Sequence, residues 1–187
     1  MMKKEIRIIG IDDSAFAKSS KGRVLVVGVV MRGGNILDGI LSTKAEIDGN
    51  NSTSQLADMI NKSKFRTQLR CIFLDGIALG GFNVVDIMEL NMKTNIPVVT
   101  IIRKYPNFRK IKETLAKINM KDKIKLIENA GEPVKIGKIF VQIAGINTWK
   151  LKEILKLACT RSHIPEPLRL AHLIATGVVR GESRGRA

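Results

Sequence analysis

The sequence is poor in cysteine and in aromatic residues, and each shortage narrows what the protein can be. It holds 2 cysteines, Cys71 and Cys159, and neither stands in a CxxC pair or beside a histidine cluster. This pattern fits a reducing compartment, although two cysteines do not exclude a disulfide. Aromatic residues make up only 4% of the chain, so a surface on which many bases stack in succession is not expected.

Long hydrophobic runs are also missing, and no apolar stretch is long enough to span a membrane. The first residues, "MMKKEIRIIG", lead directly into a strand-like pattern without the apolar core of a signal peptide. We therefore expect a cytoplasmic protein with no membrane partner. The sequence contains no nucleophile elbow, no GxxxxGK[ST] loop and no GxGxxG motif, so a dinucleotide cofactor has no support.

Acidic residues are in a clear minority. The chain has 17 Asp and Glu against 32 Lys and Arg, which gives a net charge of +15. Such an excess favours a polyanionic partner, nucleic acid first of all. The alternative is that the source organism has basic proteins in general. With 187 residues, we expect residues 1–187 to form a single domain with a substantial core.

Segments rich in β-branched and apolar residues predict strands at 5–11, 23–34, 36–47, 70–76 and 96–103. Short loops join the first three strands, which favours an antiparallel meander. A helix is expected within 47–65, and another at 82–94 separates the last two strands. That strand–helix–strand unit requires parallel strands and a right-handed crossover. An α/β fold follows, with a mixed sheet and helices packed on both faces.

The second half of the chain mixes helices with further strands. Residues 106–119 lie in a basic run with helical spacing, which fits a solvated helix face or a nucleic-acid contact. Segments 123–131 and 137–145 are expected to add strands. Amphipathic spacing predicts two last helices, at 147–162 and 165–181.

Two of the predicted strands end in acidic residues: Asp12 and Asp13 follow the first, and Asp75 follows the fourth. If these strands are parallel neighbours, the carboxylates project from the same sheet edge, where ligands of open α/β sheets bind. Two close carboxylates repel each other unless one is protonated or a cation lies between them. Oxygen ligands without a cysteine–histidine cluster favour Mg²⁺ or Mn²⁺. The alternative is that these residues cap helices or open turns.

Asp48 is a third candidate for this site. It stands in "EIDGNNST" between a strand and a helix, so it fits either a metal ligand or substrate contact or an Asp-Gly turn. His163 and His172 are separated by two prolines and do not form a metal pair at helical spacing. Arg169 and His172 share a helix face, where they either pack structurally or face a phosphate.

The order of these motifs resembles that of endonuclease V. "GIDDS", "FLDG" before a helix, "IPVVTIIRK" and "PEPLRLAH" follow one another along the chain as they do in that family. The stretches "GGFNVVDI" and "PEPLRLAHLIA…RGESRGRA" are more similar still to an archaeal family of unknown function that is distantly related to endonuclease V. This resemblance spans nearly the whole chain.

The resemblance implies a ribonuclease H-like fold, whose mixed five-stranded sheet places the first strand beside the fourth. Endonuclease V cleaves nucleic acid near deaminated adenine with the help of Mg²⁺. Asp12 and Asp75 match its two catalytic aspartates. Arg103 stands where that enzyme has a lysine after the fifth strand, which implies a phosphate contact.

The sequence departs from endonuclease V at three places. It has no tyrosine-containing wedge loop, and it lacks the catalytic glutamate before the first long helix, for which Asp48 is the nearest substitute. Phe82 and Asn83 replace a histidine-containing stretch after the second aspartate. We expect Asn83 to contact the nucleic acid in place of that stretch.

Together, these observations predict a nuclease-like protein that hydrolyses phosphodiester bonds of DNA or RNA with Mg²⁺ or Mn²⁺. The predicted metal ligands and catalytic residues are Asp12, Asp75 and Asp48, with Asp13 as a substitute for the last. The predicted nucleic-acid contacts are Arg103, Lys104, Asn83 and Arg169. Two alternatives remain: a non-catalytic nucleic-acid-binding module on the same fold, or an enzyme acting on a small phosphorylated metabolite. The sequence predicts no particular oligomeric state.

Overall fold

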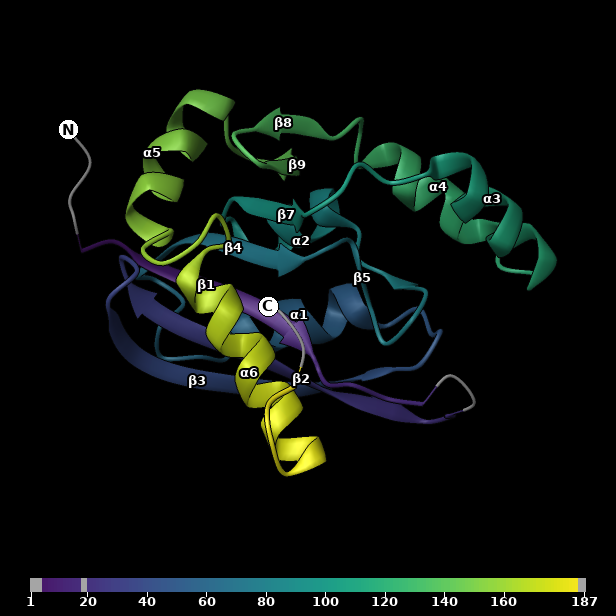
Figure 1. The fold of residues 1–187 in the computed structure, drawn as a ribbon, viewed down its shortest axis with the longest axis horizontal. Coiled ribbons are helices and arrows are strands. Elements are labelled where there is room, and N and C mark those ends of the chain that lie inside the picture. The colour runs from purple at the N-terminus through teal and green to yellow at the C-terminus, as the bar shows by residue number, and fades with distance from the viewer. Residues whose placement is uncertain (1–4, 18–19, 185–187) are drawn as a thin grey trace.

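The computed structural model describes residues 5–17 and 20–184, which form a mixed sheet with helices on both faces (Figure 1). The main sheet has seven strands in the order β3-β2-β1-β4-β7-β9-β8. They are β1 (Arg7–Asp13), β2 (Arg23–Arg32), β3 (Ile36–Glu46), β4 (Leu69–Asp75), β7 (Val98–Ile102), β8 (Val134–Ile136) and β9 (Ile139–Ala144). A separate hairpin consists of β5 (Ala78–Leu79) and β6 (Asn83–Val84).

The helices of the described residues are α1 (Ser52–Asn61), α2 (Ile87–Thr94), α3 (Phe108–Lys117), α4 (Asp122–Asn129), α5 (Thr148–Ala158) and α6 (Glu166–Arg180). The longest of them, α6, has 15 residues. No helix in this part of the chain combines the length and the apolar character that crossing a membrane requires.

Alternation along the central strands explains why both faces of the sheet are covered. In β1, Ile9 and Ile11 pack into the core under α1 and α2, whereas Ile8 points the other way and packs under α5 and α6. Because neighbouring residues of a strand face opposite sides, a run of apolar residues needs a helical layer on each side. The predicted three-layer arrangement is thereby confirmed.

The five predicted strands correspond to β1, β2, β3, β4 and β7, which are consecutive in the sheet. β1 is antiparallel to β2 and parallel to β4, as expected. The resemblance implied a five-stranded sheet, whereas β9 and β8 extend the sheet beyond β7 to seven strands. β9 confirms the strand predicted at 137–145. The helix predicted at 82–94 begins later, at Ile87, because Asn83 and Val84 pair with the preceding segment as β6.

The strand predicted at 123–131 is wrong, because Asp122–Asn129 form α4. Its apolar residues fit a period of two as well as helical spacing, so the pattern alone is ambiguous. Two residues one turn apart, Lys123 and Ile127, are buried in the structure, and the Lys123 ammonium donates a hydrogen bond to the carbonyl of Gly49. Helices α3 and α4 form an arm beside the β5–β6 hairpin (Figure 1).

Candidate metal centre

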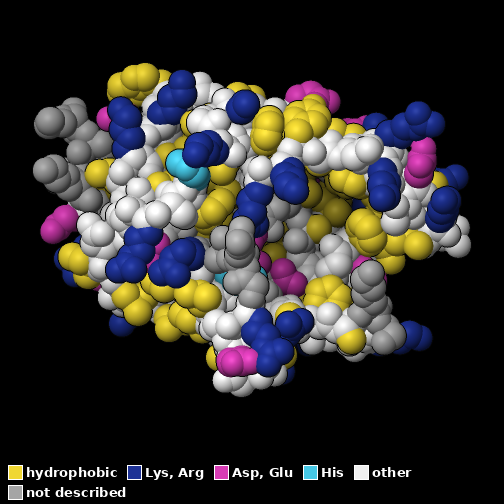
Figure 2. Space-filling model, viewed as in Figure 1, with side chains coloured by type: hydrophobic (Ala, Val, Ile, Leu, Met, Phe, Trp, Pro, Cys, Tyr) yellow, Lys and Arg dark blue, Asp and Glu magenta, His cyan; other side chains and the backbone are white. Residues whose placement is uncertain are grey.

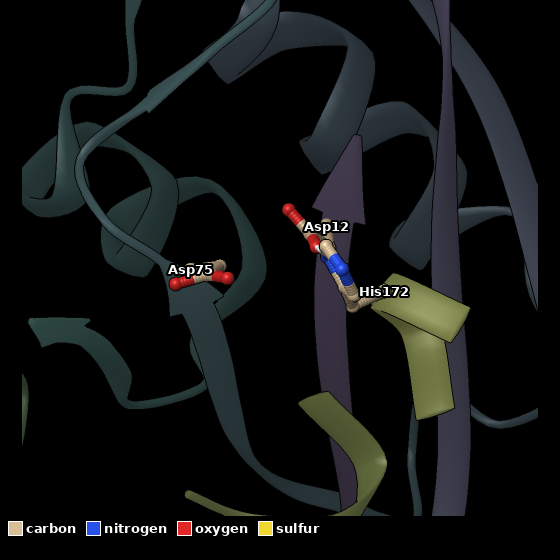
Figure 3. Close-up of side chains that lie close together, drawn as sticks. All are labelled: Asp12, Asp75 and His172. Carbon is tan, nitrogen blue, oxygen red and sulfur yellow. Dashed lines mark hydrogen bonds and ion pairs between the residues drawn. The ribbon is translucent and has the colours of Figure 1, made fainter. Parts of the chain in front are cut away.

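The register of β1 and β4 brings the two strand-end acids to one place. The strands are parallel, and Ile11 lies opposite Leu74, so the next residues, Asp12 and Asp75, leave the sheet at the same edge (Figure 3). The predicted adjacency of the first and fourth strands is confirmed. Asp12 is almost fully buried, and Asp75 is partly exposed.

A histidine from the far end of the chain completes this cluster. The Nδ1 atom of His172, on α6, lies 2.8 Å from Oδ2 of Asp12. Figure 3 shows these two side chains side by side, with Asp75 across from them. Each of the three residues offers one ligand atom, and these atoms lie within 4.8 Å of one another. Among the described residues, this is the group able to hold a metal ion.

A glycine in β1 allows α6 to come close enough for this contact. A Cβ atom on Gly10 would lie 2.2 Å from the backbone nitrogen of Leu168, so any larger residue would push the helix away. His172 follows Leu168 by one helical turn and therefore lies above the end of β1. The contact between His172 and Asp12 thus depends on both Gly10 and the "PLRLAH" stretch, which are far apart in the sequence.

The electrostatics of the cluster favour a cation. Burial, followed by the negative charges of Asp75 and Asp13, raises the pKa of the Asp12 carboxyl to about 7, against the lowering effect of its hydrogen bond to His172. Burial also raises the pKa of Asp13. A divalent cation removes this repulsion without protonating either group. The buried Nε2 atom of His172 has no hydrogen-bond partner among the described residues, so the imidazole retains coordinating capacity.

The donor set fits a divalent cation. Carboxylate oxygens suit Mg²⁺ or Mn²⁺, whereas an imidazole nitrogen is also a common ligand of transition metals such as Zn²⁺, so the donor set supports a divalent cation without selecting one. The cluster opens into a cavity of about 410 Å³, lined by the end of β1, residues 14–16, Asp75 and one face of α6, which leaves room for water and for a substrate. Figure 2 shows acidic side chains at the bottom of a hollow that lysine and arginine side chains surround.

Arg103, which was predicted to contact a phosphate, binds one of the acids of the metal centre. Its guanidinium donates to both carboxylate oxygens of Asp75, at 2.7 Å and 3.1 Å. The residue follows β7, the neighbour of β4 in the sheet. Lys104, its predicted companion, is exposed at the same edge.

Asp48 does not join the acid pair. Its backbone has a positive φ of 55°, and its carboxylate accepts a hydrogen bond from the backbone nitrogen of Phe82 at 2.8 Å. Its own nitrogen donates to the carbonyl of Gly80. The structure therefore favours the turn over the predicted metal ligand, because Asp48 is used to hold the β5–β6 hairpin. Asp13 supports the same hairpin by accepting a hydrogen bond from the Gly80 nitrogen.

Asn83, one of the predicted nucleic-acid contacts, does not lie at the protein surface. Its side chain is fully buried, where Oδ1 accepts from the Ser52 nitrogen and Nδ2 donates to the carbonyl of Glu46. Burial of both ends of the amide closes it to a ligand. The side chain instead fastens the hairpin to the start of α1.

Arg169 is also occupied within the protein. It forms a two-pronged ion pair with Glu166, one turn earlier on α6, with distances of 3.0 Å and 2.6 Å. The sequence left open whether Arg169 packs structurally or faces a phosphate, and in the structure it forms a structural ion pair. His172, for which no metal partner was predicted, contributes to the centre.

A family model described as endonuclease dU matches residues 4–179 of the sequence. The chain belongs to the endonuclease dU family. It is 46% identical over its whole length to a UPF0215 protein of Methanothermobacter thermautotrophicus, of which it covers 94%. The UPF0215 protein Mbar_A0619 of Methanosarcina barkeri is 47% identical, also over the whole chain, with 97% of that protein covered. The predicted relation to archaeal proteins of unknown function is confirmed.

Solved structures place the family within a wider fold group. A crystal structure of a protein of unknown function from Archaeoglobus fulgidus matches 95% of this chain and 100% of its own, with a TM-score of 0.88 and 38% identity. Endonuclease V of Ciona intestinalis, bound to a DNA containing an inosine followed by a ribo-adenosine, matches 95% of this chain and 87% of its own. That match has a TM-score of 0.60 and 16% identity. The fold of the family is therefore ribonuclease H-like, as predicted.

Proposed function

We propose that the protein is a divalent-metal-dependent endonuclease that cleaves DNA near deoxyuridine. The observation that carries this proposal is the convergence of Asp12, Asp75 and His172 at the edge of two parallel strands. The family's description names the substrate class, and the net charge of +15 suits a polyanion. Uracil arises from cytosine by deamination, so such an enzyme belongs to the same chemical class as one that acts at inosine.

Asp12, Asp75 and His172 are the residues that would hold the metal ion. A bound Mg²⁺ or Mn²⁺ would supply charge stabilisation to the phosphodiester and increase the acidity of water. His172 orients the Asp12 carboxylate through its Nδ1 atom. Arg103 holds Asp75 in place, and its positive charge at the site edge favours a phosphate. Burial of Asp12 keeps bulk water away from one side of the centre.

A second cavity supports recognition of a single base. It has a volume of about 220 Å³, and one of its lining residues is Gly76, which directly follows Asp75 in the sequence. Its walls are almost entirely apolar and include Ala78, Phe82 and Phe108. Sites for drug-sized ligands are larger, at roughly 300–1,000 Å³, so the volume of this cavity suits a smaller group such as a single base. A base turned out of the helix would enter it while its phosphate lies over the metal centre.

The proposed function is tested by cleavage of matched duplexes that differ at one position, which carries deoxyuridine, inosine or thymidine. Single-stranded DNA and uridine-containing RNA of the same sequence complete the set. We expect the deoxyuridine strand to be cut with Mg²⁺ or Mn²⁺ and not with EDTA. Tight binding without any cleavage would instead support the non-catalytic module. Weak binding of every nucleic acid at physiological salt would support a small phosphorylated substrate.

Arg103→Ala is expected to lower kcat/KM for the cleaved duplex by about ten- to a hundredfold, because a hydrogen bond to a charged group contributes about 1.5–3 kcal/mol. Arg103→Lys should restore only part of this loss, since lysine cannot form the two-pronged contact. Steady-state cleavage measures both variants, with Lys104→Ala as the neighbouring control. Equal rates for wild type and Arg103→Ala would show that Arg103 has no role in cleavage.

Ala78→Leu is expected to fill the apolar cavity and to lower cleavage at deoxyuridine by about tenfold or more, since an overpacked pocket rejects its ligand at about 1–3 kcal/mol. Mn²⁺ affinity should stay unchanged, because the metal ligands are not altered. Ala116→Leu, on α3 outside the cavity lining, serves as the control. If Ala78→Leu cleaves as well as that control, the base does not occupy this cavity.

A further inference from the structure

One face of α6 continues the wall of the metal centre beyond His172. His172, Thr176 and Arg180 recur every four residues and line the same 410 Å³ cavity as Asp12 and Asp75. Side chains at this spacing lie one above the other on a helix. Arg180 therefore lies two turns beyond the metal centre, on the side that faces it.

The chain after α6 folds back toward this cavity. The helix ends at Gly181, whose φ of 80° is in the left-handed region that favours glycine. Ser183 then donates a hydrogen bond from its hydroxyl to the carbonyl of Leu173, at 2.7 Å. This contact turns residues 182–184 back along the helix. As a result Arg184, which follows the helix end, also lines the cavity.

The docking of this tail explains a glycine inside the helix. A Cβ atom on Gly177 would lie 3.1 Å from the Ser183 hydroxyl, closer than most real contacts of this kind. Glycine in a helix interior costs about 1 kcal/mol relative to alanine. Glycine at position 177 therefore leaves room for Ser183 to pack against the helix.

The two arginines face a cavity whose acids are already engaged. Asp75 is paired with Arg103, and Asp12 is bonded to His172. Within the described part of the chain Arg180 forms no ion pair, and Arg184 pairs with the exposed Glu182, two residues earlier. Both guanidinium groups thus remain accessible at the rim. A guanidinium carries a planar fork of donors that matches the oxygens of a phosphate.

We propose that Arg180 and Arg184 form a phosphate clamp, which binds a backbone phosphate next to the one at the metal centre. This inference rests on the proposed function, since it assigns the clamp to the same nucleic-acid substrate. The clamp holds the strand from the side of α6, opposite Arg103. It contributes to affinity and position rather than to bond cleavage.

The clamp is tested by fluorescence anisotropy with a labelled deoxyuridine duplex in EDTA, where binding is measured without cleavage. We expect Arg180→Ala and Arg184→Ala each to weaken binding by about five- to tenfold, and to lower the slope of log K against log salt by about 1. Ser183→Ala should weaken binding in part, because it releases the tail while keeping its charge. Lys152→Ala removes an exposed charge from α5 and is the matched control.

The outcomes separate the clamp from the proposed function. If the wild type binds the duplex and both arginine variants match Lys152→Ala in affinity and salt slope, the clamp is refuted and the proposed function stands. If the wild type binds no duplex in EDTA and cleaves none with Mg²⁺ or Mn²⁺, the proposed function itself fails. If inorganic phosphate displaces the duplex equally from wild type and from the double variant, phosphate binding lies elsewhere and the clamp is again refuted.

Discussion

Asp75→Asn is expected to lower metal-dependent cleavage by about a thousandfold, because a catalytic metal supplies several kcal/mol and each 1.4 kcal/mol is about tenfold in rate. Asparagine has nearly the same volume but no negative charge, so it is a poor metal ligand and also loses the ion pair with Arg103. The fold should persist, since Asp75 lies at the end of β4 and is not part of the apolar core.

Single-turnover cleavage and titration with Mn²⁺ measure this effect from two sides. The variant should lose both cleavage and high-affinity Mn²⁺ binding, and its circular dichroism spectrum should match that of the wild type. Asp58→Asn is the matched control, because Asp58 is exposed on α1 and forms a surface ion pair with Lys62, away from the metal centre. Retention of cleavage within about tenfold, with unchanged Mn²⁺ binding, would remove Asp75 from the centre.

Asp12→Asn is expected to stabilise the metal-free protein above neutral pH while abolishing metal binding. The pKa of Asp12 is raised from 3.8 to about 7 in the folded protein. The folded state therefore binds more protons than the unfolded state between these values, and stability falls as the pH rises through this window. Above pH 7 the full penalty is present, on the order of a few kcal/mol. Asparagine carries no charge and avoids it.

Urea unfolding in EDTA at about pH 8 and about pH 4 measures this difference. The unfolding midpoint of Asp12→Asn should exceed that of the wild type at the higher pH, and the two should converge at the lower one. Mg²⁺ should then stabilise the wild type at the higher pH and leave the variant unchanged. A variant that is less stable than the wild type at both pH values would contradict the claim that the charge on Asp12 destabilises the metal-free protein.

The acid pair could be predicted in part from rules of sheet architecture. β-branched runs mark β1 and β4, and the ends of parallel neighbouring strands meet at one edge. That β1 and β4 are such neighbours was supposed from the sequence pattern and implied by the resemblance to endonuclease V. Asp12 and Asp75 stand directly at those ends. The five strands β3, β2, β1, β4 and β7 follow from the same patterns, since they carry the clearest apolar runs.

His172 could not be predicted, because its position depends on packing between distant segments. It lies 160 residues from Asp12 in the sequence, and it reaches that residue only because Gly10 lets α6 approach the sheet. A search for paired histidines at helical spacing could not find it. The signal was present in "PLRLAH", but nothing in the sequence alone shows which strand that helix crosses.

Asp48 and Asn83 show the opposite difficulty. Polar residues near strand ends are typical of ligand sites, and they are equally typical of turns. Here their side chains bond to backbone groups around the β5–β6 hairpin. That pairing depends on two loops far apart in sequence, so only the folded chain separates a structural amide from one that binds substrate.

We propose that Asp12, Asp75 and His172 hold one divalent cation. An anomalous difference map from a crystal soaked in Mn²⁺ would reveal whether they do. We expect a single strong peak within about 2.0–2.6 Å of a carboxylate oxygen from each aspartate, the range for Mg²⁺- and Ca²⁺-type ligands, and next to the imidazole of His172, with the ion pair between Arg103 and Asp75 loosened. A map without a peak there, with Asp75 still bound to Arg103 at saturating Mn²⁺, would contradict the proposal.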